Sequence, residues 1–205
     1  MKLLFLGDSI TDCYHSFDPE NLGDGYVRRI YEQFSSLPGC ETTVVSNKGI
    51  DGFTIERVCE LWQDLSGTEK ESCDIVSVLI GVNDVGVWMN CGYSGQECAA
   101  AAIRFQQCYD DLVSDILDYG IPKLVLIEPF LFPCPEKYVN WQPYVKQLGE
   151  ITARTAQKYR LSHLAIQDQL LSAAKKPDYS DITLDGIHLT EKGHDILARA
   201  WMNLT

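Results

Sequence analysis

Short apolar runs alternate with longer segments of helical periodicity along the chain. The runs are rich in leucine and β-branched residues, which is typical of strands that are covered on both faces. They lie at residues 3–6, 43–46, 75–80 and 124–127 and, with a weaker pattern, 161–166. Apolar residues recur at helical spacing between these runs, at residues 26–37, 54–65, 94–119 and 139–159, and a last such segment spans residues 190–204. The pattern therefore predicts five strands separated by helices.

Strands that alternate with helices favour a parallel sheet, because parallel neighbours need a crossover connection. Such crossovers are nearly always right-handed. We therefore expect an α/β fold, a three-layer α/β/α sandwich with a parallel sheet of about five strands, as in flavodoxin-like proteins. Ser94 and Glu97 have the spacing of a capping box at the start of one helix. The sequence contains no linker or internal repeat, so we expect residues 1–205 to form a single domain.

Composition and charge exclude several classes of partner. The 205 residues have an ordinary globular composition, but their formal net charge is -12. Because Lys and Arg form no cluster that reverses this charge, we expect no nucleic acid and no anionic membrane as a partner. The apolar run at residues 3–6 is too short for a signal peptide, and no run reaches the roughly 20 residues of a membrane span. The sequence therefore predicts a cytoplasmic protein.

The eight cysteines show neither a Cys-x-x-Cys pair nor a regular metal-ligand spacing. Several of them fall among apolar residues of the expected helices, which favours reduced thiols over a disulfide framework. His188 and His194 with Asp185 are the only residues that suggest a metal site, but a separation of six does not place two histidines on adjacent helical turns. We therefore expect no metal ion and no other cofactor.

Ligands of parallel α/β proteins bind beyond the carboxyl ends of the strands, where a serine stands here. Ser9 directly follows the first expected strand, in Gly7-Asp8-Ser9, but serine alone is a poor nucleophile and needs a base. Asp185 and His188, in Asp185-Gly186-Ile187-His188, can fold together so that the carboxylate orients the imidazole and the imidazole takes the serine proton. These three residues form a candidate catalytic triad.

A serine nucleophile also needs hydrogen-bond donors for the oxyanion of its tetrahedral intermediate. Two loops after expected strands can supply them. The glycine-rich segment at residues 47–54 contains Gly52, whose backbone N–H can approach a substrate closely, and Asn83 in Gly81-Val82-Asn83-Asp84 offers a side-chain amide.

Taken together and in this order, the four motifs resemble the SGNH (GDSL) hydrolase family. That family has a GDS motif near the amino terminus, a glycine block after the second strand, a GxND motif and a carboxyl-terminal DxxH motif. The resemblance spans the chain and implies a serine esterase with Ser9 as nucleophile, Asp185 as orienting residue and His188 as base. It also implies an oxyanion hole formed by Ser9, Gly52 and Asn83.

Longer strings around these motifs are similar to the intracellular acetylxylan esterases of that family. They lie at residues 4–13, 22–27, 45–50 and 80–85, whereas Leu184 stands where that branch has tryptophan. The resemblance implies removal of acetyl or other short acyl groups from carbohydrate through an acyl-enzyme. A lysophospholipase or thioesterase acting on lipid acyl esters would use the same residues, and a carbohydrate-binding module that has lost catalysis is an alternative from another class.

The three other histidines and three carboxyl groups near the motifs are expected to have mainly structural roles, apart from His15. His15 is a rival base because it follows Ser9 by six residues. We expect His163 to be buried and bonded to backbone, and His194 to lie on a helix near the site entrance. Turn and loop hydrogen bonds explain the three acidic residues near the motifs, Asp8, Asp12 and Asp84.

Five aromatic residues follow expected strands or begin a helix, namely Trp88, Phe130, Phe132, Tyr138 and Trp141. They could form a stacking platform for sugar rings or an apolar wall for an acyl chain. Core packing, or a subunit interface in a homo-oligomer, explains each of them equally well.

Overall fold

The computed structural model describes residues 1–71, 73–176 and 178–204. Five strands in these ranges form one parallel sheet with the order β2-β1-β3-β4-β5. They are β1 (Lys2–Gly7), β2 (Val44–Gly49), β3 (Ile75–Leu79), β4 (Lys123–Ile127) and β5 (Ser162–Leu164). Gly7 at the end of β1 is level with Gly49 of β2 and Leu79 of β3. The strands therefore end together at one edge of the sheet.

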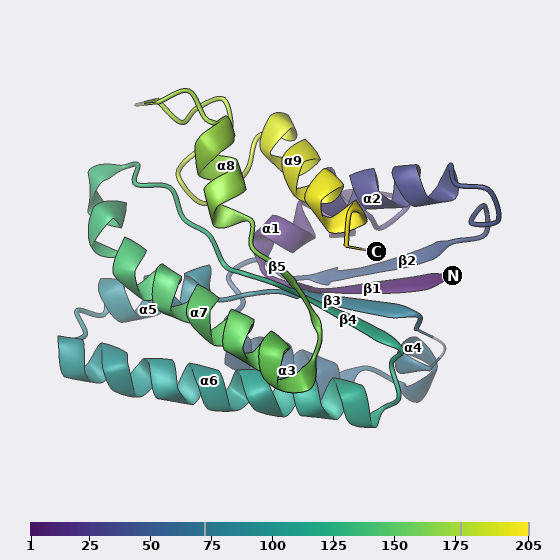
Figure 1. Ribbon diagram of the computed structural model, residues 1–205, viewed down its shortest axis with the longest axis horizontal. Helices are drawn as coiled ribbons and strands as arrows, with labels where there is room; N and C mark the ends of the chain where they lie inside the picture. Colours follow the sequence, from purple (N-terminus) through teal and green to yellow (C-terminus); the bar gives the residue numbers. More distant parts are fainter. Residues whose placement is uncertain (72, 177, 205) are drawn as a thin grey trace.

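Helices cover both faces of this sheet (Figure 1). One face carries α1 (Ser9–Asp12), α2 (Tyr26–Ser35), α8 (Gln167–Ala173) and α9 (Glu191–Met202). The other carries α3 (Ile55–Asp64), α4 (Gly67–Lys70), α5 (Val82–Asn90), α6 (Gly95–Asp118) and α7 (Gln142–Tyr159). The 3-10 helices η1 (His15–Phe17) and η2 (Glu136–Asn140) follow α1 and precede α7. The predicted three-layer α/β/α sandwich is confirmed.

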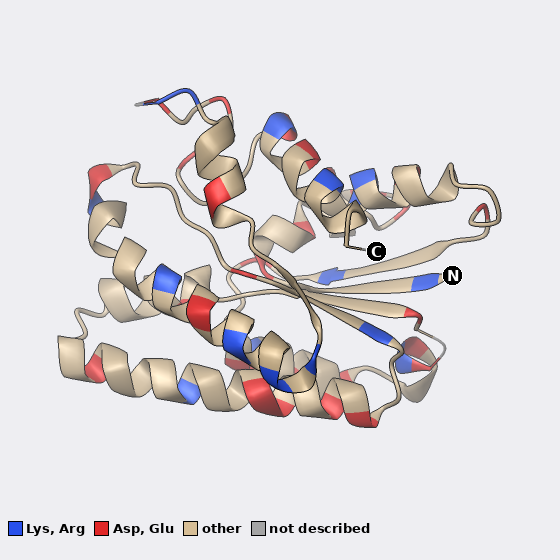
Figure 2. Ribbon diagram, in the orientation of Figure 1, with Lys and Arg blue, Asp and Glu red and all other residues tan. Residues whose placement is uncertain are grey.

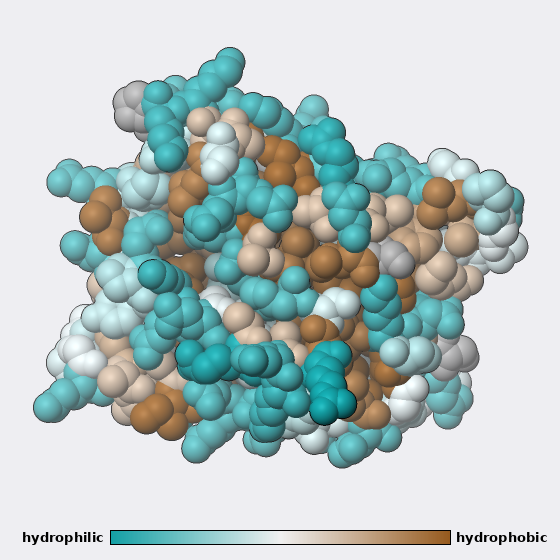
Figure 3. All heavy atoms as spheres, in the orientation of Figure 1, coloured by the Kyte–Doolittle hydropathy of each residue, from teal (hydrophilic) through white to brown (hydrophobic). Residues whose placement is uncertain are grey.

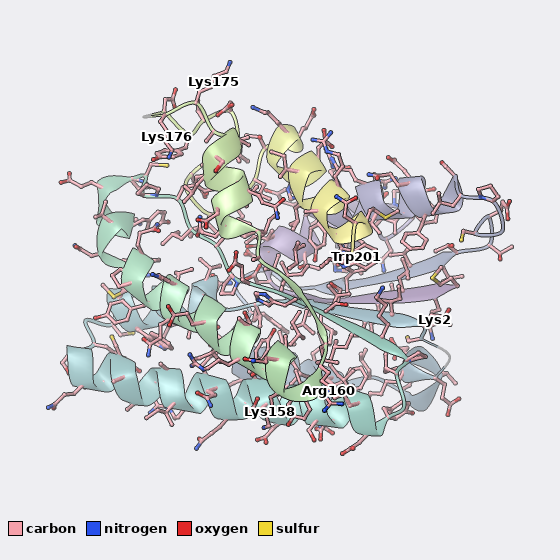
Figure 4. All side chains as sticks on the ribbon, viewed as in Figure 1. Lys2, Lys158, Arg160, Lys175, Lys176 and Trp201 are labelled. Atoms are coloured by element: carbon pink, nitrogen blue, oxygen red, sulfur yellow. The ribbon has the colours of Figure 1, made fainter. Side chains whose placement is uncertain are left out.

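The core forms where the apolar strands meet the apolar faces of the helices. The side chains from Leu3 to Leu6 in β1 are fully buried, as expected for a strand inside a two-faced sheet. Trp201 points from α9 toward the sheet (Figure 4) and donates its indole N–H to Ser77 Oγ of β3 at 3.0 Å. The buried indole thus keeps its polar group bonded while it packs α9 against the sheet.

The five predicted helices are present in the structure, with ends that differ from the prediction by up to three residues. The capping box at the start of α6 is present, since Ser94 and Glu97 exchange hydrogen bonds. The sequence pattern missed α5 and α8 and the short helices α1 and α4. Asn83 therefore lies in the first turn of a helix, α5, and not in the loop that was expected. Valines and a glycine give α5 a low intrinsic helix propensity, and burial of Val82, Val85 and Trp88 stabilises it instead.

The five aromatic residues considered for a sugar platform are buried, and that interpretation is therefore wrong. Phe130 and Phe132 have no exposed surface, and Trp88, Tyr138 and Trp141 are 6–7% exposed. Tyr138 and Trp141 pack against each other with ring centroids 4.7 Å apart. The segment after β4 folds back over the core, and that long-range packing decides their burial.

The surface mixes charged and apolar residues. Figure 2 shows Lys and Arg distributed among Asp and Glu on several elements rather than gathered in one patch. On the face drawn in Figure 3, hydrophobic residues are interspersed with hydrophilic ones. Within the described residues, no helix combines the length and the apolar character that crossing a bilayer requires.

Candidate active site

Ser9 is the first residue of α1, immediately after β1. The Asp8 side chain caps this helix by accepting a hydrogen bond from the Ile10 N–H at 3.0 Å. Gly7 is required before it, because a Cβ at that position would collide with the Thr11 side chain. The Ser9 side chain is half-buried at the edge where the strands end. The turn between β1 and α1 therefore presents its hydroxyl at the expected position for a ligand site.

The structure brings Ser9, His188 and Asp185 together in a hydrogen-bonded chain. Ser9 Oγ lies 2.9 Å from His188 Nε2, and His188 Nδ1 lies 2.7 Å from Asp185 Oδ2. Burial alone would raise the pKa of Asp185, but hydrogen bonds from the His188 ring and backbone outweigh it and lower the pKa. With Nδ1 donating to the carboxylate, Nε2 is free to accept the serine proton. This is the geometry of a Ser-His-Asp triad.

The turn that carries Asp185 and His188 is held by hydrogen bonds from Thr183. Thr183 Oγ1 donates to the His188 carbonyl oxygen at 2.8 Å and accepts from the Gly186 N–H at 2.8 Å. Gly186 has a φ of 98° and packs so tightly that a Cβ would collide with the carbonyl oxygen of Cys134. Its own carbonyl accepts from the Phe132 N–H at 2.9 Å. Contacts from the segment after β4 thus fix this turn.

The two predicted oxyanion donors follow the strands on either side of β1. Gly52 lies in the loop after β2, and its φ of 74° is in the left-handed region. Asn83 follows β3, and its Nδ2 donates to the carbonyl oxygen of Phe53 at 3.0 Å. This bond ties the Asn83 amide to the Gly52 loop and uses one of its two N–H groups. The sheet order β2-β1-β3 therefore places Ser9 between the two donor-bearing segments.

The three carboxyl groups assigned to turns and loops do bond to backbone, as predicted. Asp8 caps α1, Asp12 Oδ1 accepts from the His15 N–H at 3.2 Å, and both oxygens of Asp84 lie 3.2 Å from the Ile55 N–H at the start of α3. Burial raises the pKa of Asp8 to about 7 and that of Asp84 to about 8. Asp8 Oδ2 is buried with no hydrogen-bond partner among the described residues, which suits a protonated carboxyl.

His15 is engaged away from Ser9. Its Nε2 lies 2.9 Å from the carbonyl oxygen of Gly49, and its Nδ1 lies 2.8 Å from Asn21 Oδ1. Since both ring nitrogens already have partners, the ring bonded to the Ser9 hydroxyl is that of His188. The structure thus favours His188 over the rival base.

His194 borders the site as expected, but it is a buried residue. The Tyr26 N–H donates to its Nδ1 at 3.2 Å, and its Nε2 lies 3.3 Å from Cys13 Sγ. Burial lowers the pKa of His194 to about 4, so the ring is neutral at pH 7. His163 is half-buried, and its partner is the Thr152 hydroxyl at 3.2 Å rather than backbone.

A cavity of about 1090 Å³ opens over the triad, and Ser9, Asp185 and His188 all line it. Its wall includes two aromatic residues that the sequence pattern did not single out, Tyr14 and Phe17. Their signal in the sequence was an aromatic pair in a polar stretch just after Ser9. Nothing in the sequence marked Thr183, whose function depends on how the turn folds.

The side chains considered as metal ligands, those of His188, His194 and Asp185, do not converge on one point. Across residues 1–71, 73–176 and 178–204, no group of three or more His, Cys, Asp or Glu side chains is arranged to hold a metal ion. His188 faces Ser9, whereas His194 faces Cys13. All eight cysteines are free thiols.

Comparisons with known proteins agree with this geometry. The chain is 29% identical over 210 residues to the acetylxylan esterase of Geobacillus stearothermophilus, which covers 98% of this chain and 92% of that protein. The crystal structure of that esterase has a TM-score of 0.81 at 25% identity, covering 98% of this chain and 92% of that one. A protein from Parabacteroides merdae described as a GDSL-like lipase shares the fold, with a TM-score of 0.87, 23% identity and coverage of 100% and 94%.

The family assignment rests on a match over most of the chain. Residues 5–196 match the model of the GDSL-like lipase/acylhydrolase family. This range contains all four motifs and the complete hydrogen-bonded chain from Ser9 to Asp185. The predicted resemblance and the predicted class of enzyme are therefore confirmed. The chain belongs to the GDSL-like lipase/acylhydrolase family of serine ester hydrolases.

Proposed function

We propose that this enzyme removes acetyl or other short acyl groups from carbohydrate, with Ser9 as nucleophile, His188 as base and Asp185 as orienting residue. The observation that carries the catalytic part is the unbroken chain of two short contacts, Ser9 Oγ to His188 Nε2 at 2.9 Å and His188 Nδ1 to Asp185 Oδ2 at 2.7 Å. Structures described as catalytic mutants of the Geobacillus esterase replace one serine, one aspartate and one histidine with alanine, which supports the same division of roles.

In the first half-reaction, Ser9 Oγ attacks the ester carbonyl carbon while His188 Nε2 takes its proton. Asp185 supports the resulting imidazolium. The imidazolium then gives the proton to the alcohol oxygen as the carbon–oxygen bond of the ester breaks. The alcohol leaves, and the acyl group stays on Ser9.

The negative charge on the carbonyl oxygen has three proposed donors. Ser9 is the first residue of α1, so its N–H cannot bond within the helix. The Gly52 N–H and the second N–H of the Asn83 amide complete the oxyanion hole. The hydrogen bond from Asn83 to Phe53 supports this assignment, because it fixes the amide before the substrate arrives.

In the second half-reaction, a water molecule attacks the acyl-enzyme while His188 takes its proton. The bond to Ser9 breaks, Ser9 Oγ regains a proton from His188, and the carboxylic acid leaves. This chemistry is complete with residues of the chain and requires no cofactor.

Turnover of p-nitrophenyl esters of increasing acyl length tests the proposal. We expect hydrolysis of the acetate, a fall in kcat/KM with longer chains, and loss of activity in Ser9→Ala and after reaction with a serine-directed phosphonate. A kcat/KM that rises with acyl length would instead favour the lysophospholipase or thioesterase alternative. Acetylated xylo-oligosaccharides then test the carbohydrate part directly, since the 29% identical relative is named an acetylxylan esterase.

We also propose the cellular location, the class of partner, the domain organisation and the oligomeric state of the enzyme. Eight free thiols suit the reducing cytoplasm, and the net charge of -12 disfavours nucleic acid as a partner. We further propose a single domain over residues 1–205, supported by the family match to residues 5–196. A homo-oligomer is part of the proposal, and size-exclusion chromatography with light scattering tests it.

A further inference from the structure

The cavity over Ser9 is much larger than the acyl group that the proposed function assigns to it. At about 1090 Å³ it reaches the upper end of the roughly 300–1,000 Å³ that is usual for ligand pockets. An acetyl group fills a small part of such a volume. Most of the cavity is therefore available to the alcohol part of the ester, and its wall indicates which alcohols fit.

Three exposed apolar side chains stand on this wall. Phe17 is 89% exposed, Tyr14 is 75% exposed and Leu184 is 73% exposed, and all three line the cavity. They belong to the two chain segments that carry Ser9 and His188. Flat aromatic faces of this kind bind the C–H faces of a ligand ring while they leave its polar groups in water.

The charged residues on the same wall have one predominant sign. Six acidic side chains and one lysine line the cavity, and Lys192 is paired with Asp181 at 2.7 Å. Asp24 is 92% exposed, and its cationic neighbour is the Arg28 guanidinium, whose Nε lies 3.9 Å away. Glu191 is exposed in the first turn of α9. A negatively charged alcohol group would therefore enter a field of like charge without a free ammonium to pair with.

We propose that this cavity selects esters of uncharged polyhydroxy rings, which stack on Tyr14 and Phe17, and rejects esters whose alcohol part carries a carboxylate or a phosphate. Hydroxyl groups of such a ring can donate to the wall carboxylates, whereas an anionic substituent cannot. The inference rests on the proposed esterase function and adds the charge and shape of the leaving group. Phe17 and Tyr14 are its ring-binding residues, and Asp24 and Glu191 contribute to its charge selection.

A matched pair of substrates tests charge selection. Methyl glucoside and methyl glucuronide, each monoacetylated at the same hydroxyl, differ only in a neutral hydroxymethyl group against a carboxylate. We expect kcat/KM for the glucuronide ester to be about tenfold lower at about 0.02 M ionic strength, and the gap to narrow at about 0.5 M. The double variant Asp24→Asn with Glu191→Gln should reduce the difference in kcat/KM between the two esters at low salt as well. The control is Asp118→Asn, on α6, which lies across the sheet from α1 and α9. It should leave the difference in kcat/KM unchanged.

The ring platform is tested separately. Phe17→Ala should raise KM for the acetylated glucoside about fivefold, because the ring loses an aromatic face to stack on. Ile103→Ala is the control, because it removes an apolar side chain of α6 that is 59% exposed and should leave this KM unchanged. An unchanged KM in Phe17→Ala would overturn the role of the platform.

The two levels of the proposal fail in different ways. If Ser9→Ala still hydrolyses p-nitrophenyl acetate, the proposed catalytic function is wrong. If the parent enzyme hydrolyses that ester through Ser9 but turns over the glucoside and glucuronide esters equally at low salt, the charge selection is wrong and the esterase assignment stands.

Discussion

The two segments that meet at the triad are fixed in different ways. Ser9, the proposed nucleophile, follows the buried end of β1, and its neighbour Asp8 is 1% exposed, so the core of the sheet fixes its position. Asp185 and His188 lie on a surface turn, with side chains that are 48% and 43% exposed. Thr183, Gly186 and the segment after β4 hold that turn. The difference implies that the base can be disturbed without unfolding the protein, whereas the surroundings of the nucleophile are coupled to stability.

The largest loss of activity is expected from a change on the surface turn, the removal of the Asp185 charge. Asp185→Asn can keep the backbone hydrogen bonds that Asp185 Oδ1 accepts, but it alters the bond that Oδ2 accepts from His188 Nδ1. We expect kcat for p-nitrophenyl acetate to fall about 10³- to 10⁴-fold, through a wrongly set tautomer and lost support for the imidazolium. Circular dichroism should show an unchanged fold, and a kcat within tenfold of the parent would remove Asp185 from the triad.

The second effect concerns the oxyanion hole beside the nucleophile. Asn83→Ala should lower kcat about 100- to 1000-fold, the usual cost of one lost donor, with a smaller change in KM. Steady-state kinetics with p-nitrophenyl acetate measures both values. An unchanged kcat with a raised KM would assign Asn83 to substrate binding instead.

A subtler change tests whether Thr183 positions His188. Thr183→Val keeps the shape of the side chain but loses the bonds to the His188 carbonyl and the Gly186 N–H. We expect kcat to fall about tenfold with little change in KM, because the base loses its alignment. Thr183→Ser keeps the hydroxyl and should restore most of kcat. A loss of stability in Thr183→Val with kcat unchanged would indicate a purely structural role.

The last effect concerns the stability of the protein near Ser9, and we expect it to change catalysis least. The pKa of Asp8 rises from 3.8 to about 7 through burial, so the folded state holds a proton between these values that the unfolded state has released. This group therefore lowers the free energy of unfolding as pH rises from about 4 to about 7. Asp8→Asn removes the titration, so its stability relative to the parent should improve by about 4 kcal/mol from pH 4 to pH 8. Urea denaturation at the two pH values measures the difference, and a pH-independent difference would contradict the buried-proton account.

The strands and the proximity of Ser9, His188 and Asp185 were predictable from the sequence because their signals are local. Continuous apolar runs predict strands buried on both faces, and each motif follows such a run or precedes the last helix. The order of the motifs along the chain then carried the family resemblance that assigned Ser9, Asp185 and His188 to one site. The structure adds the distances between them.

The cavity wall and the aromatic residues were not predictable, because long-range packing decides them. Phe130 and Trp141 are buried since the segment after β4 folds back over the core, whereas Phe17 is exposed on a short 3-10 helix. No hydrophobic period distinguishes these cases. Thr183 likewise acquires its role only when the turn closes around His188.

Covalent labelling of the nucleophile tests the central claim most directly. The enzyme is incubated with an alkyl fluorophosphonate, and the modified residue is located by peptide mass spectrometry while p-nitrophenyl acetate turnover is followed. The account predicts one phosphonyl group per chain, on Ser9, with activity lost in proportion to labelling and labelling slowed strongly in His188→Ala. Stoichiometric labelling at another residue, or full labelling of Ser9 with activity retained, would contradict it.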